Sequence, residues 1–111
     1  MKKTILSIAL AVSSVFAFAQ TNADVVGEWY NAEKDAVITL YEDGSTVSGK
    51  ITWMKFPNDD NGNPKTDPEN PDEKLRSRAR LGMVMMNNFT HIEGNIWDDG
   101  NIYDPKSGNE Y

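Results

Sequence analysis

The chain of 111 residues has no cysteine and a single histidine, His91. Without cysteine there are no disulfide bonds, and one histidine alone cannot supply a zinc site. No G-x-S-x-G motif marks a hydrolase nucleophile, and His91 has no cysteine to activate. We therefore expect a protein that is not an enzyme and that carries no metal or cofactor.

Positive charge is also scarce, because 11 Lys and Arg residues stand against 17 Asp and Glu, giving a net charge of −6. Nucleic acids and anionic membrane surfaces both require a basic surface on the protein. This composition excludes nucleic acid as an expected partner. The acidity is typical of a soluble surface.

An uncharged apolar run at positions 5–18 follows Lys2 and Lys3. The run is shorter than the ~20 residues that a membrane-spanning helix needs. Ala17 and Ala19 fit a small-x-small cleavage site. We predict a helical secretory signal peptide at 1–19, a polar leader at 20–24 and one domain at 25–111. The protein is then periplasmic or secreted from a bacterium, with no membrane span after cleavage.

The rest of the chain alternates short apolar runs with turns, and no long helical pattern competes. The clearest run is 46–54, where Val47, Ile51 and Trp53 fall on one face by a period of two. The expected strands are 25–30, 36–41, 46–54, 81–86, a fifth over 89–92 and 95–97 that Gly94 interrupts, and a sixth from 102. Such a series predicts an all-β, antiparallel up-and-down meander that curls into a barrel.

A proline-rich acidic segment at 56–74 breaks this pattern. It opens like a calcium loop at Asp59, but Pro64 and Asn70 stand where such a loop needs glycine and glutamate. A solvated acidic turn is the favoured interpretation. Long loops of this kind are usually either functional or mobile.

Three arginines, Arg76, Arg78 and Arg80, follow the loop at alternate positions. Their guanidinium groups are suited to clamping an anion. The alternative is that they pair with the acidic loop itself. Aromatic and methionine side chains offer a second candidate, because they line lipid pockets well. There the alternative is a filled core, which small barrels commonly have.

A set of residues occurs along the chain in a recognisable order: Gly27, Trp29, Asn70, Pro71, Asp72, Leu75, Arg76, Arg78, Gly82, Gly100, Ile102, Tyr103, Asp104, Pro105, Gly108 and Tyr111. In this order they resemble a family of secreted bacterial proteins, domain of unknown function 2147, whose members are lipocalin-like. The resemblance covers residues 26–111 and includes Arg76 and Arg78 in its pattern.

The resemblance also implies that strands are missing, because members of the family continue past the tyrosine that matches Tyr111 with a further pair of strands. A closed small barrel needs roughly eight strands, and only five or six are found here. We therefore expect an open, incomplete barrel, truncated at its C-terminus. The alternative is a shorter relative whose open edge a partner covers. Open strand edges favour self-association.

The function expected from these observations is a non-enzymatic periplasmic or secreted module that binds a small apolar or amphiphilic molecule, such as a lipid. The alternative is a cell-envelope protein that contacts another protein, or has a structural role, and binds no small molecule. The candidate ligand-binding residues are Trp29, Trp53, Arg76, Arg78, Trp97 and Tyr103.

Overall fold

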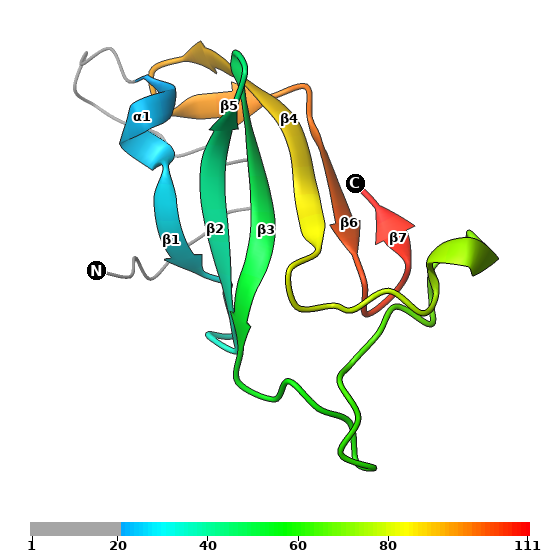
Figure 1. Cartoon of the computed structure of the whole chain (residues 1–111). Coiled ribbons are helices and arrows are strands. Elements are labelled where there is room, and N and C mark those ends of the chain that lie inside the picture. Colours follow the sequence, from blue (N-terminus) through cyan, green and yellow to red (C-terminus); the bar gives the residue numbers. More distant parts are fainter. Residues whose placement is uncertain (1–20) are drawn as a thin grey trace.

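The computed structural model describes residues 21–111, so the predicted signal peptide lies outside the described residues. One antiparallel sheet of seven strands dominates this part of the chain (Figure 1). The strands are β1 Gly27–Tyr30, β2 Ala36–Asp43, β3 Thr46–Met54, β4 Val84–Glu93, β5 Ile96–Asp98, β6 Asn101–Asp104 and β7 Asn109–Glu110. Their order is β1-β2-β3-β4-β6-β7, with β5 paired to β4, and the outermost strands β1 and β7 do not close the sheet on each other. The predicted all-β, open antiparallel meander is confirmed.

In the described residues two short helical turns accompany the sheet, α1 (Asn22–Val25) and η1 (Glu73–Leu75). Val25 was expected at the start of the first strand, but it ends α1 and its side chain is buried. The strand begins only at Gly27, whose φ of 136° favours glycine. Within residues 21–111, neither helix has the length or the apolar character to cross a membrane.

The predicted break between strands at 81–86 and 89–92 is wrong, because β4 runs without interruption from Val84 to Glu93. Asn88 falls inside it with φ of 60°. Its backbone N–H donates to Oγ of Ser48 at 3.2 Å on the neighbouring strand. This hydrogen bond keeps the strand continuous at a residue type that is depleted in strands.

The predicted face of Trp53 is also wrong. In the register of β2 with β3, Ile38 lies opposite Ile51 whereas Val37 lies opposite Trp53, so the pairing shifts by one residue between them. The extra residue is a β-bulge, and a shift of one residue turns the following side chains to the other face. Met54 therefore takes the place on the inner face that the alternation gave to Trp53.

The inner face of the sheet, which carries Ile38, Ile51 and Met86, is packed solid at one end. There α1 and the β4–β5 hairpin lie over the strands (Figure 1). Trp97 is the largest fully buried side chain among residues 21–111, and its Nε1 donates to Oδ1 of Asn22 at 2.8 Å. The cluster consists of Val25, Ile38, Leu40, Val47, Ile51, Met86, Phe89 and Trp97.

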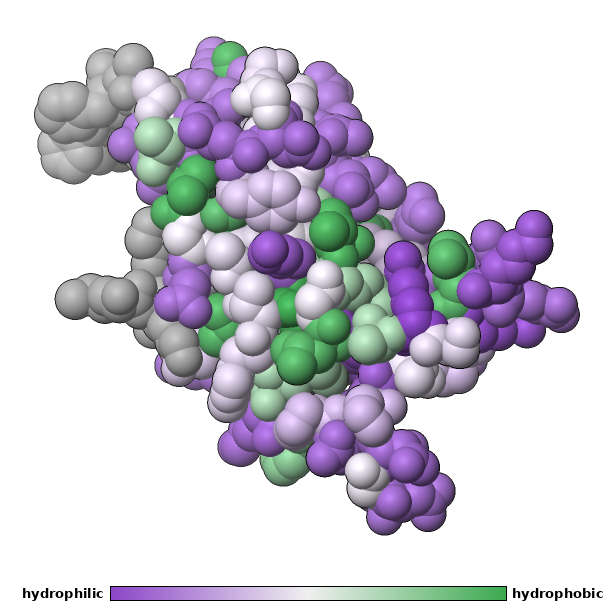
Figure 2. Space-filling view, viewed as in Figure 1, coloured by the Kyte–Doolittle hydropathy of each residue, from purple (hydrophilic) through white to green (hydrophobic). Residues whose placement is uncertain are grey.

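The long connection from β3 to β4, residues 55–83, folds back on itself outside the sheet. The backbone N–H of Asp67 donates to the carbonyl of Arg76 at 3.1 Å, and that of Arg80 to Lys65 at 2.9 Å. In Figure 2 this loop is hydrophilic, whereas apolar surface gathers over the strands. The two arms of the loop thus support each other before the chain enters β4.

Candidate functional site

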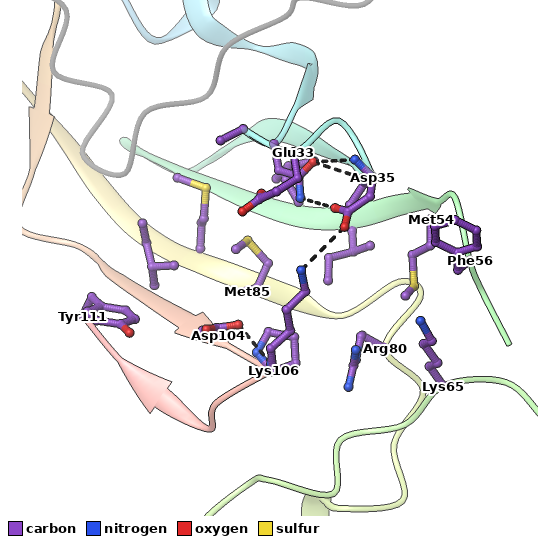
Figure 3. Close-up of a pocket in the computed structure, with 18 residues that line it drawn as sticks. Glu33, Asp35, Met54, Phe56, Lys65, Arg80, Met85, Asp104, Lys106 and Tyr111 are labelled. Atoms are coloured by element: carbon purple, nitrogen blue, oxygen red, sulfur yellow. Dashed lines mark hydrogen bonds and ion pairs between the residues drawn. The ribbon is translucent and has the colours of Figure 1, made fainter. Parts of the chain in front are cut away.

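An apolar pocket of about 510 Å³ occupies the other end of the inner face. The β1–β2 turn, the β6–β7 turn and the long loop surround it (Figure 3). Its walls come from side chains of β2, β3, β4 and β6 that point to the inner face. The main apolar wall residues are Ile38, Ile51, Met54, Met85, Met86 and Ile102. The interior is thus a filled core at one end and a hollow at the other.

Two of the acidic side chains on the pocket rim, Asp35 and Asp104, already have partners. Asp35 accepts from Nδ2 of Asn31 at 2.5 Å and forms an ion pair with Lys106 at 3.6 Å. The hydrogen bond from Asn31 lowers the pKa of Asp35, and the charge of Lys106 adds to this effect. Asp104 accepts from the backbone N–H of Lys106 at 2.9 Å.

Two cationic side chains, Lys65 and Arg80, line the pocket beside Met54 and Phe56 (Figure 3). Both are half-buried. Nε of Arg80 donates to the carbonyl oxygen of Thr66 at 3.2 Å, which fixes the guanidinium group. Within residues 21–111 neither cation has a carboxylate within ion-pair distance.

None of the six residues predicted to bind ligand lines this pocket. Trp29 packs against the core and its Nε1 donates to the carbonyl oxygen of Val25 at 2.8 Å. Trp97 is buried in the core and stacks on His91 with ring centroids 4.5 Å apart. Both tryptophans thus sit at the filled end of the interior.

Trp53 lies on the opposite face of the sheet, with Tyr30 beside it in an edge-to-face contact at 6.4 Å. Arg76 lies in the long loop, where Nε donates to the carbonyl oxygen of Asn70 at 2.7 Å and a terminal nitrogen approaches Glu73 at 3.7 Å. Their predicted role in binding stays a prediction.

Arg78 and Tyr103 meet at a buried carboxylate, Asp67, whose exposure is 0%. The Tyr103 hydroxyl donates to Oδ1 of Asp67 at 2.6 Å. Oδ2 accepts from Nδ2 of Asn70 at 2.8 Å and from Nε of Arg78 at 3.1 Å. We call these four residues the loop anchor, because they fasten the long loop to β6.

The loop anchor shifts the ionisation of its members. Burial raises the pKa of Asp67, but hydrogen bonds from Tyr103, Asn70 and Arg78, with the charge of Arg78, outweigh burial and hold that pKa below its ordinary 3.8. Burial, together with the hydrogen bond to Asp67 and its negative charge, raises the pKa of Tyr103 to about 12. Asp67 is therefore ionised and Tyr103 neutral near pH 7. The geometry thus supports the alternative in which Arg78 pairs with a carboxylate of the acidic loop.

The acidic turn that begins at Asp59 is closed by hydrogen bonds to its own carboxylate. Oδ1 of Asp59 accepts from the backbone N–H groups of Asn61 and Asn63 at 2.9 and 3.0 Å. Within residues 21–111, no group of three or more histidine, aspartate or glutamate side chains is arranged to hold a metal ion. These contacts identify the segment as a self-capped turn.

Residues 27–111 match the model of a family described as uncharacterized proteins conserved in bacteria, DUF2147. The chain belongs to this family. Among solved structures, its fold is similar to protein HP1028 from the human pathogen Helicobacter pylori, described as belonging to the lipocalin family. The TM-score is 0.58 at 21% identity, over 68% of this chain and 49% of that chain. The chain thus spans about half the length of that structure, and the likeness shows the fold alone. The comparison with curated proteins gives no match.

Membership in DUF2147 and the lipocalin-like sheet confirm the family and the fold class predicted from the sequence. The residues that carried the resemblance include Asn70, Arg78 and Tyr103 of the loop anchor. Sequence reasoning offered methionines as pocket residues and Arg80 as one of three candidate arginines, but the six residues selected included neither Met85 nor Arg80. It did not identify the aliphatic wall residues Ile38, Ile51 and Ile102. The signal for Arg80 was present, since it stands at the same spacing as the two arginines that were selected.

Proposed function

We propose that this DUF2147 protein is a non-enzymatic binding module that takes a small amphiphilic molecule into the apolar pocket, in the periplasm or outside the cell. The observation that supports the proposal most is the hollow itself, about 510 Å³ beside an otherwise filled core. Pockets that hold small molecules span roughly 300–1,000 Å³ and have mainly apolar walls with a few polar groups. The pocket meets both criteria.

Burial of an alkyl chain supplies the driving force. Each methylene group moved from water onto the walls contributes about 0.8 kcal/mol. Met54, Met85 and Met86 adapt their unbranched side chains to ligands of different shape. The charged rim then leaves a place for a polar headgroup at the mouth, so an amphiphile fits better than a wholly apolar molecule.

Filling the pocket tests the proposal. The assay is the fluorescence of N-phenylnaphthylamine, a neutral dye that brightens in apolar surroundings. Met85→Trp places an indole in the pocket, and Val84→Trp is the matched control, because Val84 lines a separate hollow on the other face of β4. We expect wild type and Val84→Trp to bind the dye, and Met85→Trp to lose at least about tenfold in affinity. Equal binding by all three proteins would place the dye elsewhere and contradict the proposal.

The natural ligand can be sought directly. Protein purified from its own host is extracted with organic solvent, and the extract is examined by mass spectrometry. A co-purified lipid in stoichiometric amount would support the proposal. A clean extract, together with a specific protein partner in a pull-down, would favour the alternative of a cell-envelope interaction module.

A further inference from the structure

The three cationic side chains that line the pocket differ in whether a carboxylate pairs with them. Lys106 is paired with Asp35 at 3.6 Å, whereas Lys65 and Arg80 have no carboxylate within ion-pair distance in the described part of the chain. This is unexpected in a protein with net charge −6, where carboxylates outnumber cations. A half-buried charge without a counterion is costly unless water solvates it or a ligand brings the opposite charge.

Arg80 is held in position by the protein without being neutralised. Its Nε donates to the carbonyl oxygen of Thr66 at 3.2 Å. Neither terminal nitrogen has a hydrogen-bond partner among residues 21–111. The other two arginines of the series differ, since Arg76 reaches Glu73 and Arg78 reaches Asp67. Arg80 alone of the three lines the apolar pocket.

Lys65 is tied to Arg80 through the backbone, because the N–H of Arg80 donates to the carbonyl of Lys65 at 2.9 Å. Its ammonium group also lies 6.0 Å from the centroid of the Phe56 ring. In Figure 3 both cations are at the Met54 and Phe56 end of the pocket, away from Glu33 and Asp35. The pocket therefore has an apolar body with two cations at one end.

We propose that the ligand is a single-chain amphiphile with an acidic headgroup, and that Arg80 and Lys65 bind this headgroup while the chain lies on Ile51, Met85 and Ile102. The assignment rests on the proposed function and adds the class of ligand. Guanidinium pairs with carboxylate or phosphate through two parallel hydrogen bonds, and a lysine beside it adds a second charge. Both headgroups share this chemistry.

The acidic side chains of the rim do not oppose this assignment. Asp35 forms an ion pair with Lys106 and accepts a hydrogen bond from Asn31, and Asp104 accepts from Oγ of Ser107 in its own turn at 3.0 Å. Glu33 is exposed to solvent on the side of the pocket away from Arg80. A headgroup between Lys65 and Arg80 thus lies beside two cations that have no carboxylate partner among residues 21–111, while Asp35 and Asp104 of the rim already have partners.

The experiment measures displacement of bound N-phenylnaphthylamine by four amphiphiles with the same alkyl chain: dodecanoic acid, monododecyl phosphate, dodecanol and dodecylamine. For the wild-type protein we expect at least one acid to bind about tenfold or more tightly than the alcohol, and the amine to bind most weakly. The comparison between the carboxylate and the phosphate identifies which headgroup the site prefers.

Two variants assign the selectivity to its residues. Arg80→Gln and Lys65→Gln are expected to weaken binding of the preferred acid about tenfold while leaving that of dodecanol unchanged. Lys74→Gln removes the same charge from an exposed lysine outside the pocket and is the control. Arg80→Lys retains a cation and is expected to keep part of the preference for acid. Unchanged binding of dodecanol also shows that each variant is folded.

The outcomes separate the two proposals. If dye and alcohol bind but neither acid binds more tightly, the headgroup assignment is wrong and the binding function stands. If the acids bind more tightly and Arg80→Gln changes nothing, another part of the protein selects the acid and the assignment is again wrong. If neither dye nor any amphiphile binds, both proposals fail together.

Discussion

Removing one hydroxyl group from the loop anchor gives the sharpest test of the structure. In Tyr103→Phe the ring remains, but Oδ1 of Asp67 loses its hydrogen bond of 2.6 Å, the only one it accepts from residues 21–111. Arg78 and Asn70 both contact the other oxygen, Oδ2, and cannot replace it. The variant therefore leaves half of a buried carboxylate without a donor.

The expected cost follows from burial and charge. Asp67 has no exposed surface and Tyr103 is 6% exposed, so water does not reach the vacated position without a rearrangement. A hydrogen bond to a charged group contributes about 1.5–3 kcal/mol, and an orphaned buried acceptor costs a similar amount. We expect the free energy of unfolding to fall by about 2–3 kcal/mol, and Tm to fall by about 4–8 °C for each kcal/mol. Tyr41→Phe is the control, because the Tyr41 hydroxyl makes no hydrogen bond within the described residues, and it should change stability by less than about 0.5 kcal/mol.

The assay is urea unfolding followed by tryptophan fluorescence, repeated from pH 7 to pH 12. The pKa of Tyr103 is raised from 10.0 to about 12 in the folded protein, so the neutral hydroxyl stabilises the fold below pH 10. This contribution is lost as the pH rises from 10 through 12, and a shift of this size corresponds to roughly 2–3 kcal/mol. In Tyr103→Phe this part of the alkaline loss should be absent. If the variant has wild-type stability at pH 7 and the same alkaline profile, the hydrogen bond to Asp67 does not contribute as argued.

Two further predictions concern the same region. Gly108 has φ of 78°, and a methyl group there would overlap the carbonyl oxygen of Glu69. Gly108→Ala is therefore expected to lower the free energy of unfolding, measured by chemical denaturation, by at least about 2 kcal/mol. The control is Gly62→Ala, at φ of 80° with open space around it, which should lower it by only about 1 kcal/mol. The pKa of Asp67 is held below 3.8, so ionised Asp67 stabilises the fold above that pH, and this contribution is lost as the pH falls below it. The urea midpoint of the wild-type protein, measured as a function of pH, should show this loss. The loss should be smaller in Tyr103→Phe, where one of the hydrogen bonds that lower the pKa is gone. Equal acid profiles for the two proteins would contradict this account of Asp67.

The fold class could be predicted from the sequence because it depends on local signals. The period of two in β3 and the Asp43-Gly44 turn specify strands and a hairpin before any tertiary contact is known. The errors arose where a distant residue decides the outcome. Asn88 stays in β4 because Ser48, forty residues earlier, accepts from its backbone. The face of Trp53 depends on a bulge that periodicity does not encode.

The candidate site was harder to predict than the fold for a related reason. Aromatic side chains drew attention because they are suited both to pockets and to cores, and here Trp97 and Trp29 serve the core. The hollow is lined mainly by aliphatic residues and methionines, such as Ala36 and Met85, although Phe56 and Tyr111 also reach it. Which of Arg76, Arg78 and Arg80 faces the pocket is set by the fold of the long loop. Their spacing in the sequence does not show which of the three arginines faces the pocket.

The loop anchor and the pocket cations belong to one structural unit, and this explains why Asn70, Arg78 and Tyr103 of the family resemblance do not line the pocket. Ordering a long loop costs about 1–2 kcal/mol of backbone entropy per residue, so a segment of this length needs strong fastening to the sheet. Asn70, Arg78 and Tyr103 provide it at Asp67, two residues after Lys65, whose backbone carbonyl accepts from the N–H of Arg80. The motif thus specifies how the loop is fastened. Under the proposal made above, the ligand is specified separately, by the side chains at positions 65 and 80 and by the apolar wall. Proteins that share the anchor can therefore differ in what they bind, and an exchange of the residues at these two positions should alter headgroup preference without altering the fold.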